Sequence, residues 1–177
     1  MGSTTTTSLG SAGGLAALKA RTGSPPACRP LYTAEQRRRR DASVWTLVQG
    51  ILAPLQFLVF LVSLGLVLHA LVTGRGAQAA NVSVLVKAAM LCAIMVTGAI
   101  WEHRVFGCYL LAPAFFWEDV ASFGVIALHA AYVVALFGSW LDETGMLLLA
   151  LAAYAAYLGN ALQFLLKLRS ARLAASA

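Results

Sequence analysis

Four long apolar segments constrain the fold of this chain more than any other feature of its sequence. They lie at 45–72, 82–101, 120–137 and 146–166. Each is at or above the roughly 18–20 residues that a helix needs to cross the hydrocarbon core of a bilayer. Backbone N–H and C=O groups find no water there and must pair within the segment, which favours the α-helix. We therefore predict an all-α, polytopic membrane protein with four transmembrane helices.

The composition agrees with this prediction and sets a polar tail apart from the rest. Hydrophobic residues make up 60% of the chain, against about 45–50% in soluble domains. Residues 1–30 are rich in Ser, Thr, Gly and Ala, and they hold too little apolar mass to form a core. We expect this tail to be disordered, with 31–173 as a single membrane domain. The three cysteines show no metal-binding spacing, so no metal site is expected.

The basic residues predict how the helices are oriented. They concentrate in the run Arg37–Arg40 before the first apolar segment and, after the last one, at Lys167, Arg169 and Arg172. The loop 138–145 has no basic residue. Because cytoplasmic loops carry an excess of Lys and Arg, we expect both termini and the connection between the second and third helices in the cytoplasm. The arginine run then marks topology and contacts anionic membrane lipid, and no nucleic-acid partner is expected.

The connection 101–119 between the second and third segments carries an unusual concentration of titratable groups. These are Glu102, His103, Arg104, Glu118 and Asp119. The uncharged run between Arg104 and Glu118 is too short to span a bilayer and long enough to dip into one. We expect an interfacial or re-entrant segment here. Carboxylates placed beside hydrocarbon are costly, so this acidic cluster is the first candidate for a functional site.

Polar residues at helical spacing form a stripe on three of the four helices. The stripes are Gln49, Gln56 and Ser63 in the first helix, Glu118, Ser122, His129 and Tyr132 in the third, and Tyr157, Asn160, Gln163 and Lys167 in the fourth. Such residues are expected to face the bundle interior, since facing lipid would be costly. Simpler roles stay open at this point. Gln and Asn often only join neighbouring helices, His129 is also suited to packing, and Asp119 is also suited to capping a helix.

Three stretches resemble the 3-vinyl bacteriochlorophyllide hydratase family of bacteriochlorophyll biosynthesis. They begin with YTAEQRRRRDASVWTLVQGILAPLQFLVFLVSLGLVL at 32–68, continue with IMVTGAIWEHRVFGCYLLAPAFFWEDV at 94–120, and end with LLALAAYAAYLGNALQFLLKLRSARL at 148–173. The resemblance implies an enzyme that adds water to the 3-vinyl group of a chlorophyllide-type tetrapyrrole, without a cofactor. It further implies a bacterial inner or photosynthetic membrane, and 31–173 as the hydratase domain. Contacts with neighbouring enzymes of the pathway are left open.

The residues suit this chemistry. Hydration of a vinyl group needs one group that donates a proton to the terminal carbon and another that takes a proton from water. We expect Glu102 and Glu118 to form this catalytic pair with Asp119 in support, and the sequence leaves open which is acid and which is base. The expected substrate-binding residues are His103, Arg104, Gln49, Gln56, Phe116, Trp117, His129, Asn160 and Gln163. His129 is also a candidate ligand for the substrate's magnesium, and the propionate is expected near Arg37–Arg40 or Lys167.

Two rival functions fit the same composition. One is a non-enzymatic membrane protein that binds pigment or haem, with His129 and His69 as axial ligands. The other is a small proton-coupled transporter with Glu102 or Glu118 as its carrier site. In transporters the carrier acid usually lies in mid-helix, whereas both glutamates here lie at the ends of the apolar segments, which disfavours the second rival.

Overall fold

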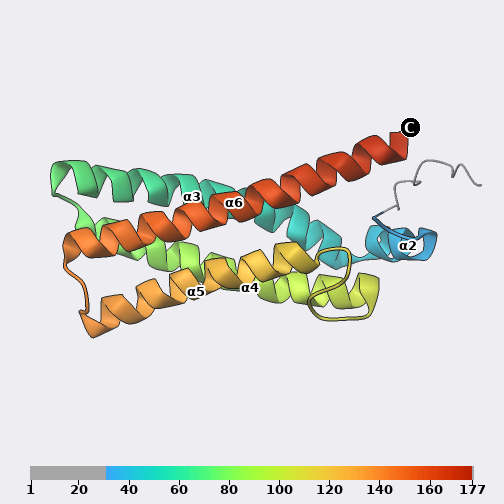
Figure 1. Ribbon diagram of the computed structural model, residues 1–177, viewed down its shortest axis with the longest axis horizontal. Helices are drawn as coiled ribbons and strands as arrows, with labels where there is room; N and C mark the ends of the chain where they lie inside the picture. The colour runs from blue at the N-terminus through green and yellow to red at the C-terminus, as the bar shows by residue number, and fades with distance from the viewer. Residues whose placement is uncertain (1–30, 177) are drawn as a thin grey trace, which may run out of the picture. The chain divides into compact units, whose positions relative to one another are not determined.

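The computed structural model describes residues 31–176, and this part of the chain is all helical apart from its connections (Figure 1). The helices are α2 (Ala34–Ala42), α3 (Val44–Thr73), α4 (Ala77–Phe106), α5 (Phe116–Gly138) and α6 (Glu143–Ser176). Helices α3 to α6 are long and apolar enough to cross a membrane. The predicted all-α class and the four membrane-spanning helices are therefore confirmed. The disorder predicted for 1–30 lies outside the described residues.

Short connections arrange the four long helices as two antiparallel hairpins. Gly74 and Gly76 link α3 to α4 with φ angles of 63° and 84°, in the left-handed region that glycine adopts without a steric penalty. Ser139 begins the similarly short link from α5 to α6, where the Asp142 side chain accepts a hydrogen bond from the Gly145 amide at 3.0 Å. Most helix contacts lie within hairpin α3–α4 and within hairpin α5–α6, and α3 also packs on α6.

The helices extend beyond the apolar segments that predicted them. Helix α4 continues through Trp101–Arg104 to Phe106, and α5 already begins at Phe116. The connection expected at 101–119 therefore shrinks to the loop 107–115. Hydropathy finds only the part of a helix that matches hydrocarbon, whereas the hydrogen-bonded ladder continues into polar residues at its ends. The carboxylates of the central cluster consequently lie on helices, where the backbone fixes their direction.

Helix α2 was not predicted, although a capping-box sequence marks its start. The Thr33 hydroxyl accepts from the Gln36 amide at 3.2 Å, and the Gln36 side chain accepts from the Thr33 amide at 2.9 Å. This reciprocal capping box follows from the spacing T-x-x-Q. Glu35 and Arg39 then pair one turn apart at 3.0 Å. The arginine run thus belongs to a short, charged helix directly before α3.

The interior of the bundle is packed with small and aromatic residues, and its exterior is apolar. Buried residues of all four long helices form one core, which includes Phe60, Val84, Tyr132, Ala150 and Tyr154. Leucine, valine and phenylalanine side chains lie exposed along the outer faces. An apolar exterior of this kind suits lipid, since lipid contact removes the cost of exposing such side chains to water.

Candidate active site

Two buried carboxyl groups meet where α4 ends and α5 begins. Glu102 lies near the C-terminus of α4 and Asp119 in the first turn of α5, and each is 5% exposed. Their side chains are within hydrogen-bonding reach of each other. Two carboxyl groups this close favour a state in which they share one proton, because two ionised groups would repel. The pair therefore places a proton donor beside a proton acceptor.

The loop between the two helices holds both carboxyl groups with consecutive backbone amides. The Leu111 amide donates to Asp119 Oδ2 at 2.7 Å, and the Ala112 amide donates to Glu102 Oε2 at 3.3 Å. Leu111 has a φ of 60°, a left-handed conformation that costs a residue other than glycine roughly 1–2 kcal/mol. Successive amides in such a turn form an anion-binding concavity. The strained turn is thus tied to the position of the two acids.

An aromatic cluster anchors this loop to the helices around it. The Phe115 side chain is 3% exposed. Its ring centroid lies 5.8–6.3 Å from those of four other rings, which belong to Trp101, Phe106, Phe164 and Tyr32. Each buried aromatic pair adds about 0.5–1.5 kcal/mol beyond the area that it buries. Phe115 therefore fixes the C-terminal end of the loop, only a few residues from the amides that bind the acids.

Glu118 has a different partner, Lys167 of α6. The Lys167 Nζ and Glu118 Oε2 atoms are 2.5 Å apart, and the Glu118 side chain is 9% exposed. A second link joins the same helices, because Asn160 Nδ2 donates to Ser122 Oγ at 2.8 Å and the Ser122 hydroxyl donates to the Glu118 carbonyl at 2.8 Å. The structure thus brings Glu102 together with Asp119, and it ties Glu118 to α6.

Asp119 lies in the first turn of α5, where the helix dipole favours an acid, but it is not the N-cap residue. The N-cap position of α5 is Phe115, which makes no side-chain capping hydrogen bond. The Asp119 carboxylate instead accepts from Leu111 across the loop. Sequence spacing could not reveal this contact, because it depends on the left-handed turn at Leu111.

Two residues that the sequence analysis did not assign lie close to the pair. Burial raises the pKa of the Tyr32 phenol, while the Arg40 guanidinium over its ring partly offsets this and Glu102 adds to it. Burial also raises the pKa of the Cys108 thiol, and the charges of Glu102 and Asp119 add to the effect. Both side chains therefore keep their protons and stay neutral. Nothing in their residue type or spacing indicates this position.

Several predicted binding residues face outward near the pair. His103 and Arg104 are exposed, and the His103 ring stacks on Tyr109 with centroids 4.1 Å apart and planes 3° apart. Phe116 and Trp117 are 41% and 72% exposed. These four side chains lie on the outside of the bundle, within three residues of Glu102 or Asp119 in the sequence, and they are not part of its buried interior.

The amide residues predicted to bind substrate have different positions. Gln49 Nε2 donates to Thr97 Oγ1 at 2.7 Å and joins α3 to α4, which is the simpler role left open for it. Gln163 is exposed, so its predicted place inside the bundle is wrong. The reason is geometric: six residues at about 100° each turn Gln163 roughly 240° around α6 from Tyr157.

Gln56 and His129 are buried, but they lie away from the acid pair. His129 follows Asp119 by ten residues in α5, which is about 15 Å along a helix. Its Nδ1 atom lies 2.8 Å from the Val125 carbonyl, and its buried Nε2 atom has no hydrogen-bond partner in the described part of the chain. The Gln56 side-chain amide is likewise unpartnered within residues 31–176. The structure therefore separates these two residues from the carboxyl groups with which they were grouped.

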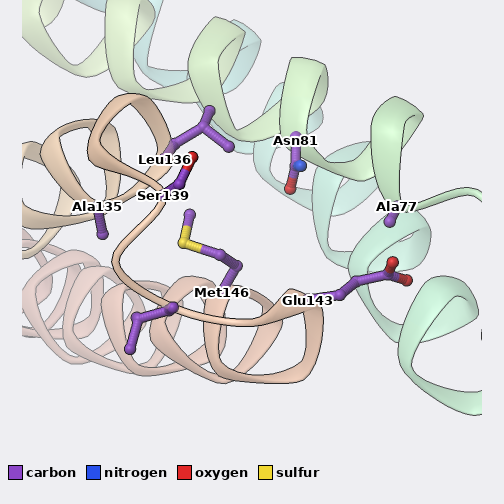
Figure 2. A pocket seen from close by; sticks show the side chains of 8 residues that line it. Ala77, Asn81, Ala135, Leu136, Ser139, Glu143 and Met146 are labelled. Atoms are coloured by element: carbon purple, nitrogen blue, oxygen red, sulfur yellow. The ribbon is translucent and has the colours of Figure 1, made fainter.

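A pocket at the opposite end of the bundle lacks the features of the acid pair. It has a volume of about 210 Å³ and lies where α4 and α6 begin and α5 ends (Figure 2). Its lining is Ala77, Asn81, Ala135, Leu136, Ser139, Leu141, Glu143 and Met146. Glu143 is the one titratable side chain in this lining, so the pocket offers no donor–acceptor pair. Within 31–176, no His, Cys, Asp and Glu side chains group in a way that could hold a metal ion.

Comparison with known proteins connects this geometry to one family. The family model for 2-vinyl bacteriochlorophyllide hydratase (BCHF) matches residues 32–170. A 2-vinyl bacteriochlorophyllide hydratase from Cereibacter sphaeroides is 67% identical over 146 residues, which cover 82% of this chain and 90% of the relative. The protein of the same name from Rhodobacter capsulatus is 64% identical over 151 residues, which cover 85% of this chain and 88% of the relative.

No solved structure matches this chain. The family name numbers only the outer carbons of the pyrrole rings. Its 2-vinyl group is therefore the same group that is called 3-vinyl in the sequence analysis. The matched region contains α2 to α5, most of α6, and both carboxyl groups of the buried pair. The chain belongs to the 2-vinyl bacteriochlorophyllide hydratase family.

Proposed function

We propose that this chain hydrates the vinyl group of a bacteriochlorophyllide, as a hydro-lyase of bacteriochlorophyll biosynthesis, and that Glu102 and Asp119 perform the proton transfers. The observation that carries the proposal is the buried contact between these two carboxyl groups, each bound by one of two consecutive amides. A hydration needs one donated and one accepted proton, and the pair provides both at one place.

The hydrogen bonds favour particular roles for the two acids. Asp119 accepts the shorter backbone bond, at 2.7 Å, and the charges of Glu118 and Lys167 act on it in opposite directions. Glu102 accepts the longer one, at 3.3 Å. Hydrogen bonds and nearby cations stabilise the ionised form of a carboxyl group. Glu102 is therefore the general acid in this proposal, and Asp119 is the general base.

The reaction then balances without a cofactor. Glu102 gives its proton to the terminal vinyl carbon, and the cation that forms at the inner carbon is delocalised into the macrocycle. Water adds to that carbon and loses a proton to Asp119. The proton passes across the shared hydrogen bond to Glu102, which restores the starting state. In this scheme Glu118 does not react; it holds Lys167 next to the pair.

The surroundings of the pair suit an apolar, disc-shaped substrate at a membrane surface. Phe116 and Trp117 expose their rings on the outside of the bundle and are proposed to contact the macrocycle, with His103 and Arg104 at its edge. In the proposed orientation both termini and the loop 107–115 are cytoplasmic, and this loop is the interfacial segment. The basic residues of α2 and of the end of α6 support this orientation.

The direct test is a conversion assay with membranes that contain the full chain. The membranes are incubated with the 3-vinyl pigment, and the products are separated by chromatography. The proposal expects a product heavier by one water, absent from membranes without the chain. A stable pigment complex with no conversion would instead favour the rival function of a pigment-binding protein.

A further inference from the structure

A second polar cluster lies in the bundle interior, and the proposed chemistry does not use it. Its members are Lys87 of α4, His129 of α5 and Gln56 of α3, which are 0%, 2% and 2% exposed. Each lies well inside a helix that is long enough to span a membrane. Ionisable and polar groups at this depth are costly, and they are a functional-site candidate by default.

Contacts between the helices tie these residues together. The Lys87 Nζ atom lies 3.5 Å from the centroid of the Tyr157 ring, and the charge of Lys87 acts on His129. Phe60, one turn from Gln56 in α3, packs its ring 5.0 Å from that of Tyr157. Residues of α3 and α4 therefore meet at Tyr157 of α6, and the His129 ring of α5 has its centroid 6.0 Å from that of Tyr154, one turn away in α6.

The polar atoms of this cluster lack hydrogen-bond partners among the described residues. Among residues 31–176, Lys87 Nζ, His129 Nε2 and both side-chain atoms of Gln56 have no hydrogen-bond partner. No carboxylate forms a salt bridge with Lys87 in this part of the chain. A cation held over an aromatic ring is attracted to it, but a ring does not replace a negative charge or an acceptor atom. The cluster therefore offers donors, and one positive charge, to an acceptor-rich anionic group.

The buried stripe of α4 connects this cluster to the acid pair. Lys87 and Glu102 both lie on the stripe, fifteen residues apart, which is about 22 Å along a helix. Leu91, Ile94 and Gly98 lie between them, and they carry no polar side-chain atom. Helix α4 packs less closely on α5 than on α3, so the line between α4 and α5 separates the two hairpins. A flat apolar molecule lying along it with one edge at Glu102 would direct its opposite edge toward Lys87.

We propose that Lys87, with Gln56 and His129, binds the oxygen-rich edge of the tetrapyrrole, with the ionised propionate paired to the Lys87 ammonium. This proposal rests on the proposed function. In a chlorophyllide the keto, ester and propionate groups lie on the side of the macrocycle away from the vinyl group. With the vinyl group at Glu102 and Asp119, that edge points into the bundle. A carboxylate and an ammonium are each costly there, and pairing offsets both costs.

The site differs from those suggested by the sequence, which were Arg37–Arg40 and Lys167. Lys167 already has Glu118 as its partner. Arg39 and Arg40 pair with Glu35 and Asp41. Lys87, in contrast, is fully buried and has no carboxylate partner among the described residues, which makes it the better complement to an anionic ligand group.

The test compares the free-acid pigment with its methyl ester, using the full chain in membranes or detergent. The variants are Lys87→Met, Lys87→Arg and, as a matched loss of one positive charge at an exposed loop, Arg75→Met. For the wild type, the KM of the ester should be about tenfold or more above that of the free acid, the size expected for a lost charged hydrogen bond. Lys87→Met should raise the KM of the free acid to that level and leave that of the ester unchanged. Lys87→Arg and Arg75→Met should both keep the preference for the free acid.

The proposal would be overturned if Lys87→Met raised the KM of the free acid and of the ester equally. It would also be overturned if the wild type had the same KM for both pigments. A thermal unfolding series separates this failure from that of the proposed function. The free acid should raise the Tm of the wild type more than the ester does, and Lys87→Met should remove this difference. Without pigment, Lys87→Met should be at least as stable as the wild type, because it removes a buried charge without a carboxylate partner. A further outcome is that the wild type hydrates neither pigment while the Tm still shows the expected differences. In that case the proposed function fails, and Lys87 still stands as the binding site for the pigment's carboxylate.

Discussion

Glu102 and Asp119 hold their carboxyl groups within hydrogen-bonding reach, although seventeen positions separate them in the sequence. The contact exists because α4 and α5 both extend past their apolar segments and the loop 107–115 folds back between them. Its two consecutive amides, of Leu111 and Ala112, then bind one acid each. Four predictions test this arrangement and the orientation that goes with it.

The first prediction concerns the strained turn at Leu111. Leu111→Gly should leave the free energy of unfolding unchanged or raise it by up to about 1 kcal/mol, because glycine adopts a φ near 60° without the steric cost. Leu111→Val should lower it, since a β-branched residue fits this conformation poorly. Thermal or denaturant unfolding of the purified protein measures both. A lower stability for Leu111→Gly than for Leu111→Val would contradict the strained turn.

The second prediction concerns the ion pair between Glu118 and Lys167. Glu118→Gln and Lys167→Met should each lower the free energy of unfolding by roughly 1–3 kcal/mol, because each leaves a partly buried partner without its charge. The double variant should lose less than the sum of the two, and a double-mutant cycle gives the coupling. Purely additive losses would show that the two side chains do not interact.

The third prediction concerns topology. Reporter fusions at residue 177 should be active only in the cytoplasm, and fusions near Asp142 only on the other side, because basic residues flank the ends of the bundle and are missing from 138–145. Moving the arginine run is a useful control, since Arg37–Arg40 supply the strongest signal. Export of the C-terminal reporter from the unmodified chain would reverse the proposed membrane face.

The sequence was sufficient for the helices and insufficient for the pairing of their side chains. Hydropathy over about twenty residues identifies a span whatever surrounds it, so α3 to α6 could be predicted. The partner of Glu102 could not, because it depends on the turn at Leu111 and on the exact helix ends. Gln163 was misplaced because a stripe built from steps of three drifts around the helix.

Lys87 shows a second limit of prediction from the sequence. Near the start of an apolar segment, a lysine is easily assigned to the flank of its helix. Helix α4 begins five residues before that segment, at Ala77, which carries Lys87 into the interior. Its burial and its lack of a carboxylate partner become visible only when the packing of all four helices is known.

The most direct test of the account is the ranking of three single variants in the conversion assay. Glu102→Gln and Asp119→Asn keep shape and hydrogen bonding but remove the proton-transfer group. Each should lower kcat by about 10²–10⁴-fold, and the double variant should be little worse, because the two groups act as one unit. Glu118→Gln should retain much more activity, since Glu118 acts only through Lys167. Near-normal turnover in Asp119→Asn together with a collapse in Glu118→Gln would contradict the account and return the chemistry to the pair Glu102 and Glu118.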